Sequence, residues 1–248
     1  MYKASSATRI IGNNLVYFES VGSTNSWASE FSKTEKIKDG MVFITDHQTA
    51  GRGQMGNSWI TEPKTNLTFS IVLLDPVTVQ EQFYLTVFVT LALRDFLNSI
   101  LSQVQIKWPN DILVNQKKIA GILIENQVRG SKVTASVIGI GLNVNQQQFG
   151  IDYATSILKE SGQMLSLSDA LGQLLSCLDE RYFQLRSGMK NLLRDEWHNG
   201  LYLKGLPHVY RSNGRSFEGV ITGVDDDGRL AVETNEGQRI FGFKEISY

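Results

Sequence analysis

The first part of the chain alternates short apolar runs with polar loops, a pattern typical of strands joined by turns. Residues 41–45 and 66–74 form two β-prone runs, and 119–127 and 133–144 form two longer ones around a turn at 130–131. The run at 105–114 begins and ends like a strand. Pro109 lies in its middle and cannot donate to a sheet, so a turn, bulge or edge is predicted there. A second turn is predicted at 115–118. Together these runs predict a mixed or antiparallel sheet.

Helical patterns fall between and after these strands. A first helix is predicted to begin near residues 23–25, where serine and threonine supply good N-cap side chains. The most apolar stretch, 83–101, predicts a long buried helix. From Ser166 onward leucines recur at helical spacing behind a capping-box pattern, and a shorter helix is predicted at 190–197.

The C-terminal segment has a different pattern. Short strand-like runs are separated by turn residues at 213–214, 225–228 and 235–237, which predicts a small barrel of about five strands. The expected fold is therefore α+β, with a central sheet, flanking helices and a small C-terminal β-barrel. Glycine and proline concentrate near 200–205, so we predict two domains, residues 1–201 and 202–248.

Composition narrows the class of protein. The 248 residues are 42% hydrophobic and 20% charged with a net charge of −1, which is ordinary for a globular protein and lacks the basic surplus of a nucleic-acid-binding one. One cysteine excludes an intrachain disulfide, and the three histidines lack metal-ligand spacing. No signal peptide is evident, and Arg94 and Asp95 interrupt the longest apolar run, which argues against a membrane span. We expect a cytoplasmic location.

Four motifs bear residues suited to chemistry. They are GRGQMGNSW at 51–59, KWPND at 107–111, KIAGILIE at 118–125 and IGIGLNVN at 138–145. Each has an ordinary structural interpretation when taken alone: a glycine turn, a packed tryptophan, a solvated lysine or closely packed strands. Their joint occurrence in one sheet-forming region favours a binding site.

The charged members of these motifs suit a polyanion. Arg52, Lys107 and Lys118 could converge on a nucleotide triphosphate, and Asp111 could hold Mg²⁺. Trp59 or Trp108 could stack on a planar base.

Neutral hydrogen-bonding side chains suit a second kind of ligand. Ser23, Thr24, Asn25 and Gln48 could bind an uncharged polar head such as a urea or an amide. No Cys/His or Ser/His pattern indicates an acyl-enzyme, so direct attack on an activated phosphate is favoured.

In this order and spacing the motifs resemble those of the biotin protein ligases, also called biotin–acetyl-CoA-carboxylase ligases. The resemblance rests on STN at 23–25, Q-x-A-GRG-x-x-G-x-x-W at 48–59, KWPND, KIAGILIE and GIGLNV at 139–144, and it covers nearly the whole chain. It implies a class II synthetase-like ligase core and a C-terminal SH3-like barrel.

The resemblance also implies a reaction. Biotin and ATP, with Mg²⁺, would form biotinyl-5′-AMP, and biotin would pass to a lysine of a biotin carboxyl carrier protein. The glycine-containing loop would close over the anhydride. Lys118 and Arg52 would be catalytic, and Asp111 would bind the metal. The implied biotin contacts are Ser23, Thr24, Asn25, Gln48, Arg52, Gly53, Gln54, Lys118 and Gly121, and the implied ATP contacts are Arg52, Trp59, Lys107, Asn110, Lys118 and Asn143.

The sequence departs from the family pattern at three loop positions. Gln54, Met55 and Asn57 stand where arginine is common. Neutral glutamine cannot form the charge-assisted contact that arginine makes, so our hypothesis is weaker retention of the adenylate. Too few residues precede STN for the DNA-binding domain of some members, and we predict no DNA binding.

Other functions stay open at this stage. Lipoate or octanoate protein ligases share the fold, but their glycine run followed by His-Asp is missing. A non-catalytic biotin-binding relative is the second alternative, which Lys118 and Asp111 argue against. A carrier could dock on an exposed sheet edge by β-augmentation, and the same edge could form a homodimer.

Overall fold

The computed structural model describes residue 2 and residues 8–248. Seven strands form the larger sheet, in the order β1-β2-β3-β7-β6-β5-β4. Strands β1 and β2 are parallel and the other neighbours are antiparallel. Their bounds are β1 Leu15–Val21, β2 Met41–Gln48, β3 Leu67–Leu74, β4 Val104–Lys107, β5 Asp111–Val114, β6 Lys117–Arg129 and β7 Lys132–Leu142. The prediction of a mixed sheet is confirmed.

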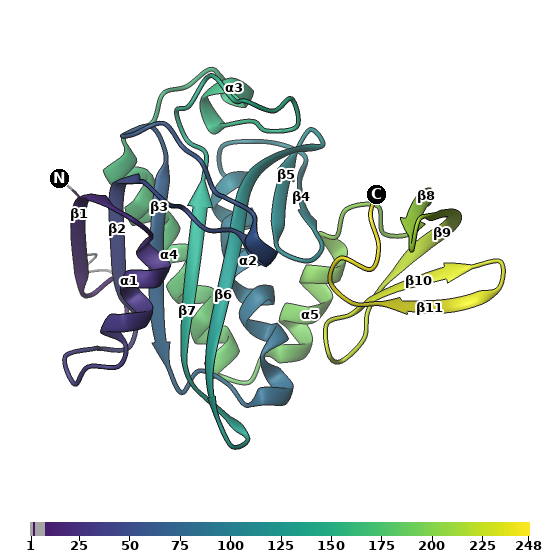
Figure 1. Ribbon diagram of the computed structural model, residues 1–248, viewed down its shortest axis with the longest axis horizontal. Helices are drawn as coiled ribbons and strands as arrows, with labels where there is room; N and C mark the ends of the chain where they lie inside the picture. The colour runs from purple at the N-terminus through teal and green to yellow at the C-terminus, as the bar shows by residue number, and fades with distance from the viewer. Residues whose placement is uncertain (1, 3–7) are drawn as a thin grey trace.

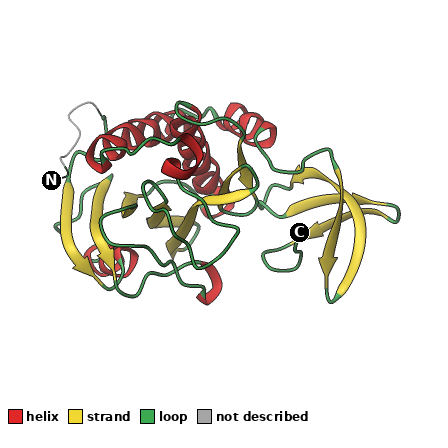
Figure 2. Ribbon diagram, turned by 90° about the horizontal axis from the view of Figure 1, so that it is seen from above, coloured by secondary structure: helices red, strands yellow, loops and turns green. Residues whose placement is uncertain are grey.

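Helices cover the two faces of this sheet unequally (Figures 1 and 2). The long helices α2 (Phe83–Asn98) and α4 (Leu167–Arg186) lie on one face together with α5 (Lys190–Asn199). Helix α1 (Thr24–Phe31) lies on the other face, and α3 (Ile157–Ser161) is a single short turn. Among the described residues, no helix is long and apolar enough to cross a membrane.

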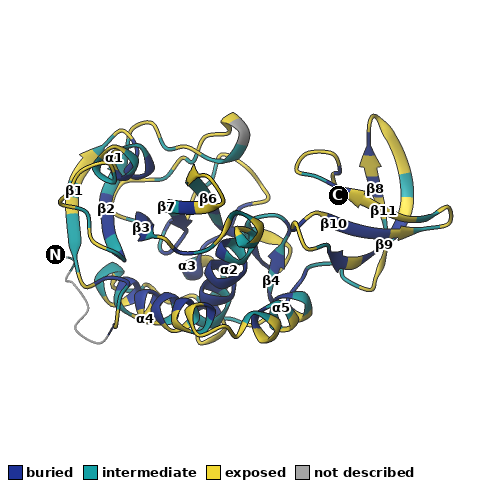
Figure 3. Ribbon diagram, turned by 90° about the horizontal axis from the view of Figure 1, so that it is seen from below, coloured by how far each residue is buried: buried dark blue, intermediate teal, exposed yellow. Residues whose placement is uncertain are grey.

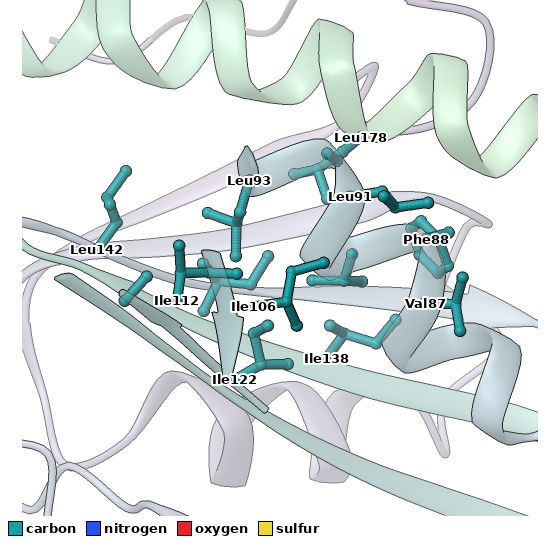
Figure 4. Close-up of a cluster of buried hydrophobic side chains, with 14 of the residues drawn as sticks. Val87, Phe88, Leu91, Leu93, Ile106, Ile112, Ile122, Ile138, Leu142 and Leu178 are labelled. Carbon is teal, nitrogen blue, oxygen red and sulfur yellow. The ribbon is translucent and has the colours of Figure 1, made fainter. Parts of the chain in front are cut away.

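The main hydrophobic core lies between the sheet and α2 with α4 (Figures 3 and 4). Phe88 and Leu91 of α2 meet Ile138 of β7, Ile122 of β6 and Leu178 of α4 in one buried cluster. A smaller cluster on the opposite face joins Ala28 of α1 to the sheet. The apolar run at 83–101 is therefore a core helix, as predicted.

The face of the sheet that carries α1 differs in character from the core face. Because side chains alternate along a strand, Ile138, Ile140 and Leu142 of β7 enter the main core while Gly139 and Gly141 face the other way. We call this second face the cavity face, since the site described below lies on it. Around the site it carries Leu123 and otherwise small or polar residues, namely Thr68, Ser70, Gly121, Glu125, Gly139 and Gly141, whereas Phe43, Val72 and Val137 pack with Ala28 of α1.

The smaller sheet has the order β11-β10-β9-β8. Its strands are β8 Pro207–Ser212, β9 Arg215–Val224, β10 Leu230–Thr234 and β11 Gly237–Phe241. Four strands are described rather than about five, because the segment after Phe241 forms only an isolated bridge between Ser247 and Arg211. The predicted boundary between residues 201 and 202 falls in the connection between α5 and β8.

Local predictions from turn and cap chemistry are confirmed. Asn115 and Gln116 adopt positive φ angles in the hairpin turn between β5 and β6. Ser23 and Ser166 cap α1 and α4 through their side chains. Pro109 lies between β4 and β5 rather than inside a strand. Strand β1 and helix α3 were not predicted.

A buried carboxylate ties the start of the chain to α4, and its removal is our first prediction. Asp179 accepts backbone hydrogen bonds from Arg9, Ile10 and Ile11 at 2.7, 2.8 and 2.8 Å. Asp179→Ala leaves these donors without an acceptor, so the free energy of unfolding should fall by about 2–3 kcal/mol. Urea denaturation measures the change.

The neighbouring carboxylate provides the control. Glu180 makes only exposed contacts, including an ion pair with Arg9 at 3.0 Å. Glu180→Ala should change stability by less than about 0.5 kcal/mol. Equal losses in the two variants would contradict the role assigned to Asp179.

Candidate active site

A cavity of about 490 Å³ lies on the cavity face, a size suited to a small-molecule ligand. Strands β3, β6 and β7, the start of α1 and the turn between β4 and β5 surround it, together with the loop at 51–58 and the C-terminal segment 243–248. The lining contains all but one of the site residues that the sequence predicts, namely Ser23, Thr24, Asn25, Gln48, Arg52, Gly53, Gln54, Trp59, Lys107, Asn110, Asp111, Lys118 and Gly121.

Neutral hydrogen-bonding groups form one part of the lining. Gln48 Oε1 accepts from Thr24 N at 2.8 Å and from Thr24 Oγ1 at 3.1 Å. Ser70 Oγ lies 2.8 Å from Thr24 Oγ1 and 2.7 Å from Asn25 Oδ1. Because these groups hold one another, their orientations are fixed before any ligand arrives. We call Ser23, Thr24, Asn25, Gln48 and Ser70 the polar pocket.

Glycines form the floor beside the polar pocket. A Cβ on Gly139 would overlap Asn25 Oδ1, and one on Gly141 would lie 2.5 Å from the indole nitrogen of Trp59. Gly121 pairs with Gly141 across the strands and also lies under Trp59. The missing side chains therefore leave the room in which Asn25 and the indole lie against the sheet. The indole nitrogen is buried there without a hydrogen-bond partner among the described residues.

Cations gather beyond the glycine floor. Lys118 Nζ forms an ion pair with Asp111 at 2.6 Å, and Lys107 Nζ lies 4.8 Å from the centre of the Tyr248 ring. Burial, followed by smaller contributions from Tyr210, Tyr202 and the Asp111 charge, raises the pKa of Tyr248, which keeps its hydroxyl neutral. The charged side chains at this end are Lys107, Lys118 and Lys244 against Asp111, whereas Arg52 also lines the cavity but is paired with Glu125. This surplus of positive charge suits phosphate groups.

The loop at 51–58, called here the glycine loop, is a small hydrogen-bonded unit. Gly53 N donates to Asn57 O at 2.7 Å, and Trp59 N donates to Gly51 O at 3.0 Å. Arg52 attaches the loop to the protein: it donates to Ser26 Oγ at 3.0 Å and forms an ion pair with Glu125. Gln54 lines the cavity, as do Gly53 and Asn57.

Asn143 lies outside the cavity lining. It is buried, and its Nδ2 donates to Thr155 O at 2.9 Å. Its backbone N donates to Ile119 O at 2.9 Å, and Thr155 N donates to Lys118 O at 2.9 Å. These contacts tie the chain after β7 to the strand that carries Lys118. Its contact with ATP stays a prediction.

Three features of the site were not assigned from the sequence. Ser70 is, with Thr68, one of two polar residues in β3, and this alternation is visible in the sequence. Glu125 ends the motif KIAGILIE but received no role. The C-terminal segment 243–248 lines the cavity, and Trp108 Nε1 donates to Gly228 O in the loop between β9 and β10 at 2.9 Å, so the C-terminal part of the chain contributes to the site. Nothing in its sequence pattern indicates this.

Comparison with known families agrees with this geometry. The biotin/lipoate A/B protein ligase family model matches residues 17–143, and the biotin protein ligase C-terminal domain model matches residues 210–247. The chain belongs to the biotin/lipoate A/B protein ligase family. It is an enzyme of the ligase class, and within the family it is similar to biotin protein ligases.

Individual relatives support the narrower class. The chain is 32% identical to the bifunctional ligase/repressor BirA of Bacillus subtilis, over 93% of this chain and 72% of the relative. It is 32% identical to the biotin–acetyl-CoA-carboxylase ligase of Mycobacterium tuberculosis, over 86% of this chain and 80% of the relative. The fold matches that of Aquifex aeolicus biotin protein ligase in complex with biotin and ATP, with a TM-score of 0.77, 24% identity, and coverage of 94% of this chain and 97% of that one.

The glycine floor yields the second prediction. In Gly141→Ala the new Cβ would clash with the indole of Trp59, so the ring must leave the floor and enter solvent. The tryptophan fluorescence should shift to longer wavelength. The same substitution in a Trp59→Phe background should produce no shift, because the indole nearest to Gly141 is then absent.

A matched glycine provides the control. A Cβ on Gly150 would meet nothing within 4 Å, so Gly150→Ala should leave the spectrum unchanged. An unshifted spectrum in Gly141→Ala would show that the indole does not rest on the floor.

Proposed function

We propose that this enzyme activates biotin with ATP to biotinyl-5′-AMP and transfers biotin to a lysine of a biotin carboxyl carrier protein. The observation that carries the proposal is a single cavity in which a neutral polar pocket and a cation-rich end are joined by a glycine floor. The names of the relatives and the biotin and ATP of the Aquifex complex support it.

The polar pocket suits the uncharged ureido head of biotin. Its Ser, Thr, Asn and Gln side chains offer both donors and acceptors, and they lie in fixed positions. No charged side chain belongs to this pocket. An apolar tail would then run from this pocket toward Lys118, beside the floor that Asn25 and Trp59 cover.

In the first step the biotin carboxylate attacks the α-phosphorus of ATP. A carboxyl-oxygen-to-phosphorus bond forms, the bond from that phosphorus to the bridging oxygen breaks, and pyrophosphate leaves with that bond's electron pair. Lys118 offsets the charge that develops on the phosphate oxygens, and Lys107 and Arg52 add positive potential. The Lys118–Asp111 pair keeps the ammonium at the cation-rich end until phosphate arrives.

In the second step a neutral lysine amine of the carrier attacks the acyl carbon of the anhydride. An amide bond forms, AMP leaves, and the attacking nitrogen loses a proton. The glycine loop and Trp59 cover the floor in this structure and would keep water from the anhydride.

Magnesium fits the site in a limited way. Asp111 is the carboxylate of the lining, and the described residues contain no group of three or more acidic, histidine or cysteine side chains that could hold a metal. Mg²⁺ accepts such a site when substrate phosphates and water complete its coordination. Asp111 would hold it, and the ion would neutralise phosphate charge.

The carrier would dock on the edge of β6. Pairing with β5 ends at Asp111 and Gly121, so β6 extends beyond its neighbour toward Arg129. An added strand could pair with this uncovered edge. The same edge could instead form a homodimer, which we keep as a prediction. The near-neutral net charge still favours a partner other than nucleic acid.

The third prediction tests the first half-reaction. Labelled pyrophosphate should exchange into ATP when biotin is present but not when lipoate replaces it. Lys118→Ala should lower the exchange rate at least about 100-fold, because it removes the cation nearest the reacting groups. The adjacent, exposed Lys117→Ala is the matched control and should retain the rate.

Other outcomes distinguish the alternatives. Exchange with lipoate would identify a lipoate ligase. Biotin binding without exchange would identify a non-catalytic relative. An unchanged rate of pyrophosphate exchange in Lys118→Ala would show that Lys118 does not take part in the first step.

The fourth prediction concerns Gln54. This neutral side chain lines the cavity close to Arg52. Gln54→Arg adds a cation there and should slow release of biotinyl-5′-AMP about tenfold, the effect of one charge-assisted contact. Rapid-dilution measurement of adenylate release gives the rate. Gln54→Met has similar length without charge and should release adenylate at the original rate; equal rates in all three proteins would sink the hypothesis.

A further inference from the structure

Glu125 connects two parts of the site that the sequence motifs treat separately. Its Oε2 accepts from Asn25 Nδ2 at 2.9 Å, and its Oε1 forms the ion pair with Arg52. Asn25 is 3% exposed and belongs to the polar pocket, whereas Arg52 belongs to the glycine loop. One carboxylate therefore holds the pocket with one oxygen and the loop with the other.

The position of Glu125 follows from its strand. Gly121, Leu123 and Glu125 share the cavity face of β6 because side chains alternate. Asn25 Nδ2 also lies 3.3 Å from Leu123 O, so the amide is aligned along β6 toward Glu125. The register of β6 thus places the carboxylate between α1 and the loop.

The glycine loop has few other supports. A second cavity of about 420 Å³ lies beside it, lined by loop residues together with Leu123 and Glu125. Arg52, Gly53, Asn57 and Ser58 line both cavities. Space on two sides leaves little packing beneath the loop, and its internal hydrogen bonds let it move as one unit. Its position therefore depends on Trp59 at its end and on Arg52 near its start.

We propose that Glu125 is a positioning residue that fixes the glycine loop over the cavity by holding Arg52 and Asn25 at once. The inference rests on the proposed function for what the loop covers. Glu125 does not contact the reacting atoms. It slows ligand escape, and it links occupation of the polar pocket to closure of the loop.

Glu125→Gln tests the inference with little change in shape. The amide loses the negative charge and turns one of the two acceptor oxygens into an NH2 donor, so it cannot offer a separate acceptor oxygen to Asn25 and to Arg52. Hydrogen exchange of the peptide 49–59 in the ligand-free enzyme should become about fivefold faster, as expected for loss of one partly exposed ion pair. Exchange in α4 should not change.

Glu30→Gln is the matched control. Glu30 also forms an exposed ion pair, with Lys33 at 2.7 Å, but it lies away from the loop. Hydrogen exchange of the glycine loop in Glu30→Gln should equal that of the wild type.

Enzyme kinetics give a second readout. In the biotin-dependent exchange of pyrophosphate into ATP, Glu125→Gln should raise the KM for biotin about fivefold, while the maximal rate changes less than about twofold.

High salt weakens the ion pair between Glu125 and Arg52 in the wild-type protein, so it provides a test that does not depend on how a variant folds. Near 1 M salt the Debye length is about 3 Å, so wild-type loop exchange should approach that of Glu125→Gln, which should itself respond little. Unchanged loop exchange in Glu125→Gln, or a loss of maximal rate with unchanged KM, would overturn the inference. The ligand-free measurements stand even if biotin proves not to be the substrate, in which case only the proposed function fails.

Discussion

The two-residue period of β7 is the constraint on which the site depends. Ile138, Ile140 and Leu142 must enter the main core, and this fixes which residues face the cavity. A one-residue slip would put these apolar side chains into the cavity and glycines into the core. At the cavity-facing positions any side chain would occupy the space that Asn25 and Trp59 use. Core packing and the shape of the site are thus set by the same register.

The chain is nearly neutral overall, and the positive electrostatic potential of its cavity arises from a local cluster of cations. The net charge is −1, yet the cavity lining carries a surplus of cations. Lys107 and Asp111 end and begin adjacent strands, and Lys118 is the second residue of the next one, so two short hairpins bring them together. The Lys118–Asp111 pair lowers the repulsion among the cations without removing the surplus. Phosphate groups would then meet a preformed positive end opposite a neutral pocket.

Sequence reasoning succeeded where a local pattern decides the structure. Pro109 marked the turn between β4 and β5, Ser166 marked a helix start, and the apolar run at 83–101 became α2. Strand β1 was not predicted from the sequence, because its residues are mostly half-exposed and lack a clear alternation of apolar and polar positions, as suits an edge strand. Helix α3 spans only five residues, too few for a helical period to show. The residues that the motifs single out line one cavity, apart from Asn143, and their roles stay predictions. Contacts such as that of Ser70 with Asn25 depend on strand register and could not be derived locally.

The C-terminal part of the chain forms part of the site because a loop of the smaller sheet and the segment after β11 contact the turn that carries the site's charges. Trp108 donates its indole hydrogen to Gly228, its ring packs 5.4 Å from that of Phe243, and Lys107 lies against Tyr248. These contacts hold Lys107 and Trp108, the two residues that precede Pro109, against the C-terminal part of the chain. Since Asp111 lies two residues after Pro109, displacement of the C-terminal segment would shift the carboxylate that pairs with Lys118. The cation-rich end of the cavity is therefore shaped jointly by the larger sheet and the C-terminal segment 243–248, whereas the polar pocket belongs to the larger sheet and α1.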